Sequence, residues 1–557
     1  MQLATIDIVV VVAYAIAIFL LAQYVSREKA GHQKDTSDYF LASKNLPWWA
    51  IGASLIAANI SAEQIVGMSG SGYAIGLAIA SYEWMAAATL LIVGKFFLPI
   101  FLKNEIYTMP QFLARRYGRL LPILMAVFWL GLYVFVNLTS IIWLGSIAVT
   151  KVAGINQNAA LVILGAFALL YQIRGGLKAV ALTDIVQVTL LVLGGLVVAF
   201  LTLSKIGGGA GFVAGFGKLM HQVPDHFHMI LKKGDPHYVA LPGLSVLIGG
   251  MWIANISYWG FNQYIIQRAL AAKNLDEAQR GVLFAAFLKL LTPLIIVVPG
   301  IAAVMLAPGL PKPDEAYPTM MRLLPTGLLG LVFAALIAAI VASTASKINS
   351  IATIFTLDLY AKIRGDRTRA EDSEGTTGEE RHLVLVGRIA AITAIVIAIL
   401  VARPLVGASE QAFQFIQEFT GFFTPGITVI FLLGLFWKRA NEAGAFAAAI
   451  ASVGISALAK PDWVALAASG VGHWWGKAIQ ALLPILGPLH DLPFMDRMGV
   501  VFLISIALAV IISLVTKPRP GADTIDTSNV RYATRTGFNI GALGVILILV
   551  ALYATYW

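Results

Sequence analysis

Long apolar runs follow one another along nearly the whole chain and predict a protein built from membrane-crossing helices. A helix needs about 20 predominantly apolar residues to cross the hydrocarbon core, and about fourteen runs come near that length. The runs lie at 6–25, 47–72, 74–102, 120–150, 157–173, 177–204, 241–266, 280–307, 325–360, 383–406, 411–437, 441–459, 496–515 and 537–556. The pattern therefore predicts an all-α polytopic membrane protein.

The second run is interrupted at its middle by polar residues. Asn59, Ser61, Glu63 and Gln64 lie midway along 47–72, and three glycines follow them. Unsatisfied backbone groups are costly in lipid, so an unwound turn is tolerated only where it faces other protein or a small aqueous cavity. Secondary transporters bind ions and solutes at such broken helices. We therefore expect a discontinuous helix at 47–72 and a solute site beside it.

The run 241–266 contains a second copy of the same letters. Ile253–Ser257 repeats Ala57–Ser61 almost letter for letter. A match this short can arise by chance in a chain rich in alanine and isoleucine. Each copy, however, opens a set of five apolar runs, as two homologous halves would require. We expect a second break at this copy.

Composition and charge narrow the class of protein further. Hydrophobic residues make up 59% of the chain and charged residues 12%, with a mean hydropathy of +0.82, which is far from soluble composition. The net charge of +10 does not indicate nucleic-acid binding, because the basic residues lie in short loops between apolar runs. Cysteine is absent, so disulfides and thiolate metal sites are excluded.

The basic loops also predict the orientation of the chain. They follow the first, third, seventh, ninth and eleventh runs, and fourteen alternating spans would place them all on the cytoplasmic side, with both termini outside. The polar stretch 366–382 is expected to be a disordered linker. Residues 461–486 are either an interfacial helix or a fifteenth span, and a span would move the C-terminus to the other side.

Glu83, Asp184 and Lys289 are ionisable residues that lie inside apolar runs. A charge at the centre of a bilayer is expensive, so such residues normally face a cavity or a partner. The alternatives are a structural ion pair for Glu83 and Lys289, and a position near the water boundary for Asp184. All eight histidines lie outside the predicted spans, which argues against an enzyme embedded in the membrane.

Amides and aromatic rings complete a possible solute site. The amides are Asn59, Gln64, Asn255 and Gln417, and the rings are Tyr82, Tyr258, Trp259 and Phe413. Each amide has the alternative of a simple hydrogen bond between helices. Together with Glu83 and Lys289, the set offers donors and acceptors for several hydroxyls and a flat face for a sugar ring.

A small cation would need oxygen ligands. Carbonyls at the first break, near Ala57 and Ile60, could combine with the hydroxyl of Ser343. The alternative for Ser343 is a hydrogen bond to its own helix backbone, which is common for serine in membrane helices.

Several long segments resemble the sodium:solute symporter family. They are Leu46–Tyr73, Ala78–Met85, Gly175–Val188 and Tyr258–Arg268. The resemblance covers nearly the whole chain and weakens at 308–317, 366–382 and 461–495. It implies the LeuT-type fold, in which two inverted repeats of five helices each contain a discontinuous helix. The implied parts are a peripheral helix at 6–25, a first repeat at 47–204, a second repeat at 241–437 and peripheral helices at 441–557.

The resemblance also implies roles for individual residues. Sugar contacts fall on Gln64, Glu83, Asn255, Lys289 and Gln417, with Asn59 adjacent. Tyr258 is expected to stack on the sugar as the inner gate beside Trp259, while Met68, Tyr82 and Phe413 match the outer gate. Sodium ligands fall on the carbonyls of Ala57, Ile60 and Ala339 and on the hydroxyl of Ser343, and Asp184 matches an acidic residue on the ion's exit route.

Two positions depart from sugar-transporting members of the family. Ala86 and Ala342 stand where such members carry serines, one facing the sugar and one beside the sodium ligand. The expected function is sodium-coupled uptake of a galactose- or glucose-like monosaccharide across the bacterial cytoplasmic membrane, with sodium as the coupling ion and no other cofactor. The alternatives are a symporter for myo-inositol, an amino acid or a carboxylate, and a sugar sensor that does not transport.

Overall fold

The computed structural model describes residues 3–25, 46–106, 108–172, 177–364, 377–460, 488–518 and 525–557. Within these ranges the regular structure is helical, and one isolated β-bridge joins Leu46 to Ala272. The helices of the first half are α1 (Thr5–Val25), α3 (Trp48–Asn59), α4 (Ser69–Ala74), α5 (Ser81–Ile92), α6 (Leu98–Lys103), α7 (Met109–Arg116), α8 (Leu120–Gly131), α9 (Thr139–Ala153), α10 (Gln157–Gln172), α11 (Leu177–Gly207), α12 (Gly211–Gln222), α13 (Leu244–Ile248) and α14 (Gly250–Ile256).

The second half continues the all-helical pattern. Its helices are α15 (Gln263–Leu270), α16 (Leu275–Leu306), α17 (Ala316–Met321), α18 (Leu328–Thr353), α19 (Ala361–Arg364), α20 (Thr377–Val401), α21 (Ala412–Thr420), α22 (Thr424–Phe436), α23 (Glu442–Leu458), α26 (Phe494–Val515) and α27 (Thr536–Thr555). Several helices are joined by π-helical segments at Glu63–Met68, Val93–Phe97, Leu132–Leu138, Ser257–Phe261, Ile354–Tyr360 and Ala402–Val406.

The predicted apolar runs form helices, with interruptions inside several of them. Among these residues, nine helices are long and apolar enough to cross a membrane, or up to eleven if each of two bent pairs is one span. Three shorter apolar helices, Thr5–Ile18, Gln157–Leu170 and Glu442–Leu458, occupy further runs. The chain is a multi-pass membrane protein, and the count of fourteen spans stays a prediction.

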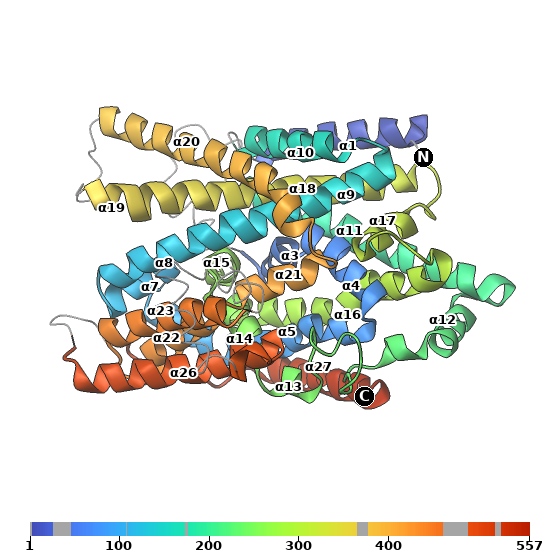
Figure 1. Ribbon diagram of the computed structural model, residues 1–557. Coiled ribbons are helices and arrows are strands. Elements are labelled where there is room, and N and C mark those ends of the chain that lie inside the picture. Colours follow the sequence, from blue (N-terminus) through green and yellow to red (C-terminus); the bar gives the residue numbers. More distant parts are fainter. Residues whose placement is uncertain are drawn as a thin grey trace, which may run out of the picture.

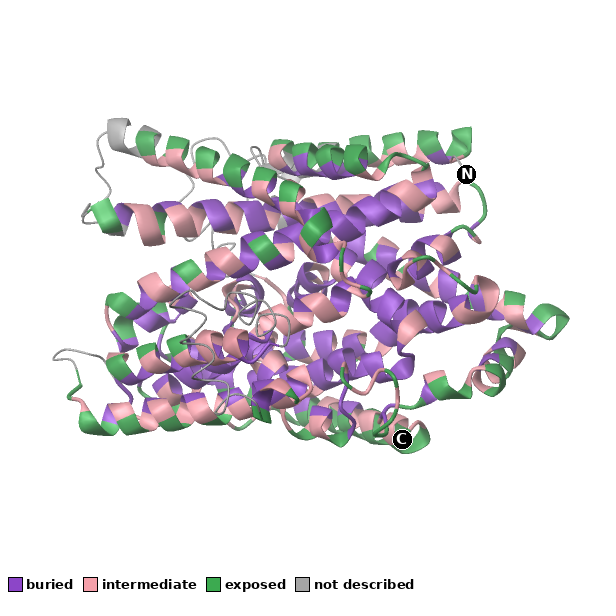
Figure 2. Ribbon diagram, in the orientation of Figure 1, coloured by how far each residue is buried: buried purple, intermediate pink, exposed green. Residues whose placement is uncertain are grey.

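The short helices of the breaks lie in the middle of the molecule. In Figure 1, α3, α4 and α21 are enclosed between α18 and α9 on one side and α16 and α5 on the other. Figure 2 shows that burial is concentrated in these central helices, whereas α1, α20 and α26 expose one face. The exposed faces carry large apolar side chains such as Ile8, Leu385 and Leu503, as expected for surfaces that contact lipid.

The first break lies where the sequence predicts it. α3 ends at Asn59, and Ile60 takes an extended conformation with φ −73° and ψ 107°. The chain becomes helical again at Glu63 and continues into α4, and the two arms are bent by 65°. The last carbonyls of α3 have no partners within their own helix, so they are available to neighbouring groups.

The second break differs from the prediction. Ile253–Ser257 lies within α14 and the start of the following π-helical segment, so the repeated letters mark a helical arm and not the break. The chain becomes extended at Asn262, with φ −81° and ψ 116°. The Asn262 side chain accepts a hydrogen bond from the backbone N–H of Tyr264 at 3.1 Å, which starts α15. A side chain able to cap the next helix fixes the position of the break.

A third bend was not predicted. The run 411–437 is divided into α21 and α22, which meet at an angle of 43°. Pro425 lies in the first turn of α22, where its missing N–H costs nothing but where it prevents continuation of a preceding helix. This bend allows α21 to approach the first break while α22 runs in a different direction.

One loop prediction was wrong in part, and another lies outside the described residues. The end of the expected linker 366–382 is helical from Thr377, where Glu379 and Glu380 favour the start of a helix. The connection 205–240 between two predicted runs contains α12. Residues 461–486 are not among those that the structure describes.

A close contact between glycine and backbone fixes α16 against the first broken helix. A Cβ added at Gly300 of α16 would lie 2.1 Å from the carbonyl oxygen of Ser69 in α4. The backbone at Ser69 has little room to retreat, because both partners are fully enclosed. The two helices therefore depend on a glycine at this crossing.

We predict that Gly300→Ala lowers the free energy of unfolding by about 1–3 kcal/mol, the usual cost of overpacking a tight contact. Gly131→Ala is the matched control, because nothing lies within 4 Å of a Cβ added there and alanine favours helix by less than about 1 kcal/mol. Thermal unfolding of the purified variants in detergent measures both. Equal stability of the two variants would contradict the contact.

Candidate functional site

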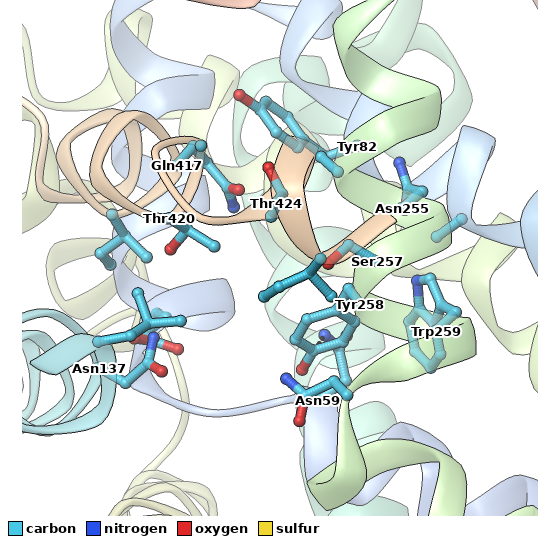
Figure 3. Close-up of a pocket in the computed structure, with 18 of the residues that line it drawn as sticks. Asn59, Tyr82, Asn137, Asn255, Ser257, Tyr258, Trp259, Gln417, Thr420 and Thr424 are labelled. Atoms are coloured by element: carbon cyan, nitrogen blue, oxygen red, sulfur yellow. Dashed lines mark hydrogen bonds between the residues drawn. The ribbon is translucent and has the colours of Figure 1, made fainter. Parts of the chain in front are cut away.

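A central cavity of about 110 Å³ lies beside both broken helices and α21. Of the residues expected at a solute site, it is lined by Asn59, Gln64, Tyr82, Glu83, Asn255, Tyr258, Trp259, Phe413 and Gln417. Figure 3 shows Gln417 and Thr420 on one helix of the cavity and Tyr258, Trp259 and Asn255 on another. Side chains that are far apart in sequence therefore meet at a single place.

Lys289 connects several residues of this site without lining the cavity itself. It is fully buried on α16, and its Nζ donates to Glu83 Oε2 and to Asn59 Oδ1. The ammonium also lies 5.2 Å from the centroid of the Trp259 ring. Glu83 and Lys289 thus form the structural ion pair that the sequence offered as an alternative to a role in the site. Glu83 also lines the cavity.

A hydrogen bond joins the two broken helices directly. The Asn59 amide donates to the Tyr258 hydroxyl at 3.2 Å, so a residue at the end of α3 contacts the π-helical segment of the second broken helix. Asn59 therefore belongs to one network with Lys289, Glu83 and Tyr258. Removing any member leaves another buried polar group without its partner.

Two aromatic side chains of the cavity lining contact each other. Tyr82 and Phe413 meet edge to face, with ring centroids 5.1 Å apart and planes at 89°. The Tyr82 hydroxyl is buried and has no hydrogen-bond partner among the described residues. Met68 is fully buried and is not among the residues that line the cavity. Of the three residues expected at this gate, Tyr82 and Phe413 therefore pack together at the cavity, and Met68 is buried outside its lining.

Six polar lining residues were not assigned to the site from the sequence. They are Glu63, Asn137, Ser257, Asn262, Thr420 and Thr424. Asn137 and the three hydroxyl residues are polar residues in apolar runs, a pattern equally typical of hydrogen bonds within or between helices. The sequence alone could not identify Thr424 as a lining residue of the cavity. The structure does so, because it shows the bend between α21 and α22 beside Thr424.

A second, smaller cavity brings together all four residues expected to hold sodium. Ala57, Ile60, Ala339 and Ser343 line a space of about 10 Å³, which is the room needed by about one water molecule. Ala342 lines it too. The neighbouring Thr344 hydroxyl donates a hydrogen bond to the Ile340 carbonyl of its own helix at 2.7 Å. The alternative considered for Ser343 is therefore found at the next residue. Residues at and just after the end of α3 and residues of α18 thus line one small space.

The predicted ion route is only partly described. Asp184 lies in α11, but its side chain is outside the described residues. Gln187 and Val188, one turn further along α11, line the small cavity.

A buried carboxyl group joins α21 to the outer arm of the first broken helix. Asp314 accepts a hydrogen bond from the backbone N–H of Ala412 at 3.2 Å, and it lies against Gly70. Burial raises the pKa of Asp314 to about 7. The contact at the start of α21 therefore contains a group that is partly protonated near neutral pH.

Comparison with solved structures identifies the fold. The chain matches a sodium-coupled sialic acid symporter, solved in a substrate-bound outward-open state, with a TM-score of 0.69 and 22% identity over 92% of this chain and 98% of that one. The fold is the LeuT type, as expected. Together with two broken helices around a polar cavity, it defines a secondary transporter.

The chain belongs to the sodium:solute symporter family, whose sequence profile matches residues 39–452. It is 46% identical to a Vibrio parahaemolyticus protein described as a sodium/glucose cotransporter, over all of this chain and 99% of that protein. It is 35% identical to a Bos taurus protein described as sodium/myo-inositol cotransporter 2, over 79% of this chain and 67% of that protein.

We predict that Lys289→Ala destabilises the protein by roughly 3–5 kcal/mol, because it leaves the buried Glu83 charge without its partner. The double variant Glu83→Gln with Lys289→Met removes both charges and should recover most of that loss. Thermal unfolding in detergent is the measurement. A double variant as unstable as Lys289→Ala would contradict the ion pair as the source of the effect.

Proposed function

We propose that this protein is a sodium-coupled symporter that imports a monosaccharide of the glucose or galactose class by alternating access. The observation that carries the proposal is that two sets of residues meet, a set with polar and aromatic side chains around the central cavity and the four expected sodium-binding residues around the small one. The similarity over the full chain to a protein described as a sodium/glucose cotransporter supports it.

The central cavity suits a sugar chemically. Gln64, Asn255 and Gln417 each offer donors and acceptors, and Glu83 offers acceptor oxygens. The Tyr258 ring provides a flat surface against which the apolar face of a pyranose can stack. Lys289 fixes Glu83 and Asn59, so these groups are held in place before a ligand binds.

The assignment of individual roles follows the same logic. Gln64, Glu83, Asn255, Lys289 and Gln417 bind or position the sugar, with Asn59. Tyr258 and Trp259 close the inner side, and Tyr82 and Phe413, supported by Met68, close the outer side. The protein acts as a transporter and not as an enzyme, in the bacterial cytoplasmic membrane, with both termini outside the cytoplasm.

Sodium occupies the small cavity in this proposal. The carbonyls of Ala57, Ile60 and Ala339 and the hydroxyl of Ser343 are hard oxygen ligands of the kind that small cations prefer. A cation bound there joins the first broken helix to α18. Sodium then favours the conformation in which the sugar site is formed, and the ion leaves by the side of Asp184 on α11.

Myo-inositol is the second candidate substrate. Several relatives, including the Bos taurus protein, are described as sodium/myo-inositol cotransporters, and a cyclic polyol can use the same donors and acceptors. Ala86 lines the cavity and contributes no hydroxyl, which leaves the preference among epimers to the remaining polar groups. A carboxylate substrate is disfavoured, because Glu83 faces the cavity and would repel it.

Uptake by proteoliposomes tests the proposal. Labelled glucose, galactose and myo-inositol are supplied with an inward sodium gradient, an equal potassium gradient or a proton gradient. We expect accumulation of a hexose with sodium alone. Uptake driven by protons and indifferent to sodium would refute the sodium assignment, and accumulation of myo-inositol without a hexose would establish the second candidate.

We predict that Ser343→Ala abolishes the effect of sodium on sugar binding while weak, sodium-independent binding remains. Linkage is reciprocal, so in wild-type protein sodium and sugar must tighten each other's binding by the same factor. Ala342→Ser adds an oxygen donor and should raise sodium affinity. Sugar binding is titrated against sodium in all three proteins, and unchanged coupling in Ser343→Ala would show that the ion binds elsewhere.

We predict that Tyr258→Phe keeps most sugar binding and Tyr258→Ala loses it. Phenylalanine preserves the ring, whose stacking contributes about 0.5–1.5 kcal/mol beyond buried area, and it loses the hydrogen bond from Asn59. Equilibrium binding of the labelled hexose measures both variants. If the two variants bind equally well, the aromatic face does not contribute to recognition.

A further inference from the structure

A buried lysine that the proposed transport cycle does not use lies on α18. Lys347 is 6% exposed, and its Nζ is 4.6 Å from the centroid of the Tyr133 ring and 4.5 Å from that of Tyr264. Cation–π contacts of this kind stabilise a desolvated ammonium but do not neutralise it. Lys347 therefore keeps a positive charge that interacts electrostatically with neighbouring groups.

The opposite charge is Glu63, in the outer arm of the first broken helix. The Glu63 carboxylate interacts electrostatically with Lys347 and lies beside Asn137. Its Oε1 atom is buried without a hydrogen-bond partner among the described residues, while the residue lines the central cavity. Glu63 thus has the Lys347 charge as its counter-ion and retains acceptor capacity.

Lys347 and Glu63 do not line the proposed sodium cavity, but both lie near residues that do. Lys347 follows Ser343 by four residues on α18, so the two lie on one helix face about 6 Å apart along the axis. Helical side chains incline toward the N-terminus, which brings the ammonium back toward Ser343. Tyr264, which contacts Lys347, is itself a lining residue of the small cavity. Glu63 lies three residues beyond Ile60, another lining residue.

A second cation nearby, Arg268, is held by other groups. Its guanidinium donates to Ser54 Oγ at 3.0 Å and to the Tyr264 carbonyl, and it stacks over the Tyr264 ring at 4.8 Å. Its position is fixed by these contacts, so it contributes a constant field to every variant considered below.

We propose that Lys347 and Glu63 are an affinity-setting pair for the coupling cation, in which the ammonium weakens sodium binding and the carboxylate strengthens it. The inference rests on the proposed sodium site and adds two residues that do not themselves ligate the ion. A unit charge about 10 Å from a bound cation changes the cation's affinity on the order of tenfold at an effective dielectric constant of about 20.

The pair also accounts for how a site with few donors can be regulated. Ala342 contributes no side-chain oxygen, so the ligands alone form a weak site, and the net field of neighbouring charges decides how weak. Because Glu63 belongs to the broken helix and Lys347 to α18, any relative movement of these helices changes that field. Sodium affinity is then linked to conformation through charges as well as through ligands.

Direct binding of radioactive sodium to the purified protein, without sugar, tests the proposal. We expect Lys347→Met to tighten sodium binding about tenfold, Glu63→Gln to weaken it about tenfold, and the double variant to return close to wild type. Lys347→Arg keeps the charge and should leave the affinity within about threefold. A purely structural role would weaken binding in both single variants and would not be rescued in the double variant.

Lys460→Met is the matched control. Lys460 likewise lies over an aromatic ring, Phe419 at 4.7 Å, and pairs with a carboxylate, Glu418 at 2.9 Å, but it does not line the small cavity. The sodium affinity of the Lys460→Met variant should equal that of the wild-type protein. Shifts in the same direction for Lys347→Met and Glu63→Gln, or no shifts, would overturn this inference alone. Wild-type protein that binds no sodium would overturn the proposed function and this inference with it.

Discussion

The unwound turn between Asn59 and Glu63 is the constraint on which the rest of the molecule depends. Backbone groups released from a helix cannot stay unsatisfied in lipid, so the turn must be enclosed by protein. α16, α11 and α15 pack against α3, and α16 packs against α4. Both cavities open where these helices surround the turn. Enclosing the break and forming the binding sites are therefore one structural requirement.

The same constraint explains what could be predicted from the sequence. Apolar runs determine where helices form, and a polar cluster within one of them marks the first break, so a helical membrane protein with a broken helix followed from the pattern. The LeuT-type fold was implied by the family resemblance. Glu83 and Lys289 were identified because an ionisable residue in such a run must have a partner. The position of the second break could not be read from the repeated letters, because it depends on Asn262 capping α15. Asn137 and Thr420 escaped notice because a lone polar residue looks the same toward a cavity as toward a neighbouring helix.

Two lysine–carboxylate pairs connect the first broken helix and its neighbours to the surrounding helices. Lys289 of α16 holds Glu83 and Asn59 by direct hydrogen bonds, whereas Lys347 of α18 acts on Glu63 at longer range and rests between two tyrosine rings. Glu83 and Glu63 both line the larger cavity, whereas Lys347 contacts Tyr264, a lining residue of the smaller one. The two lysines thus act from separate helices, α16 and α18, on one broken helix and its neighbours.

The network of Lys289, Glu83, Asn59 and Tyr258 has a consequence for how such proteins can diversify. Each member supports another, so a single substitution damages the scaffold before it can alter recognition. Ala86 and Thr424 border the same cavity outside these hydrogen bonds, and the Thr424 hydroxyl contacts Met498 at 3.1 Å. Lineages that exchange one hydroxylated solute for another are expected to accumulate their changes at such peripheral positions, while the four networked residues stay constant.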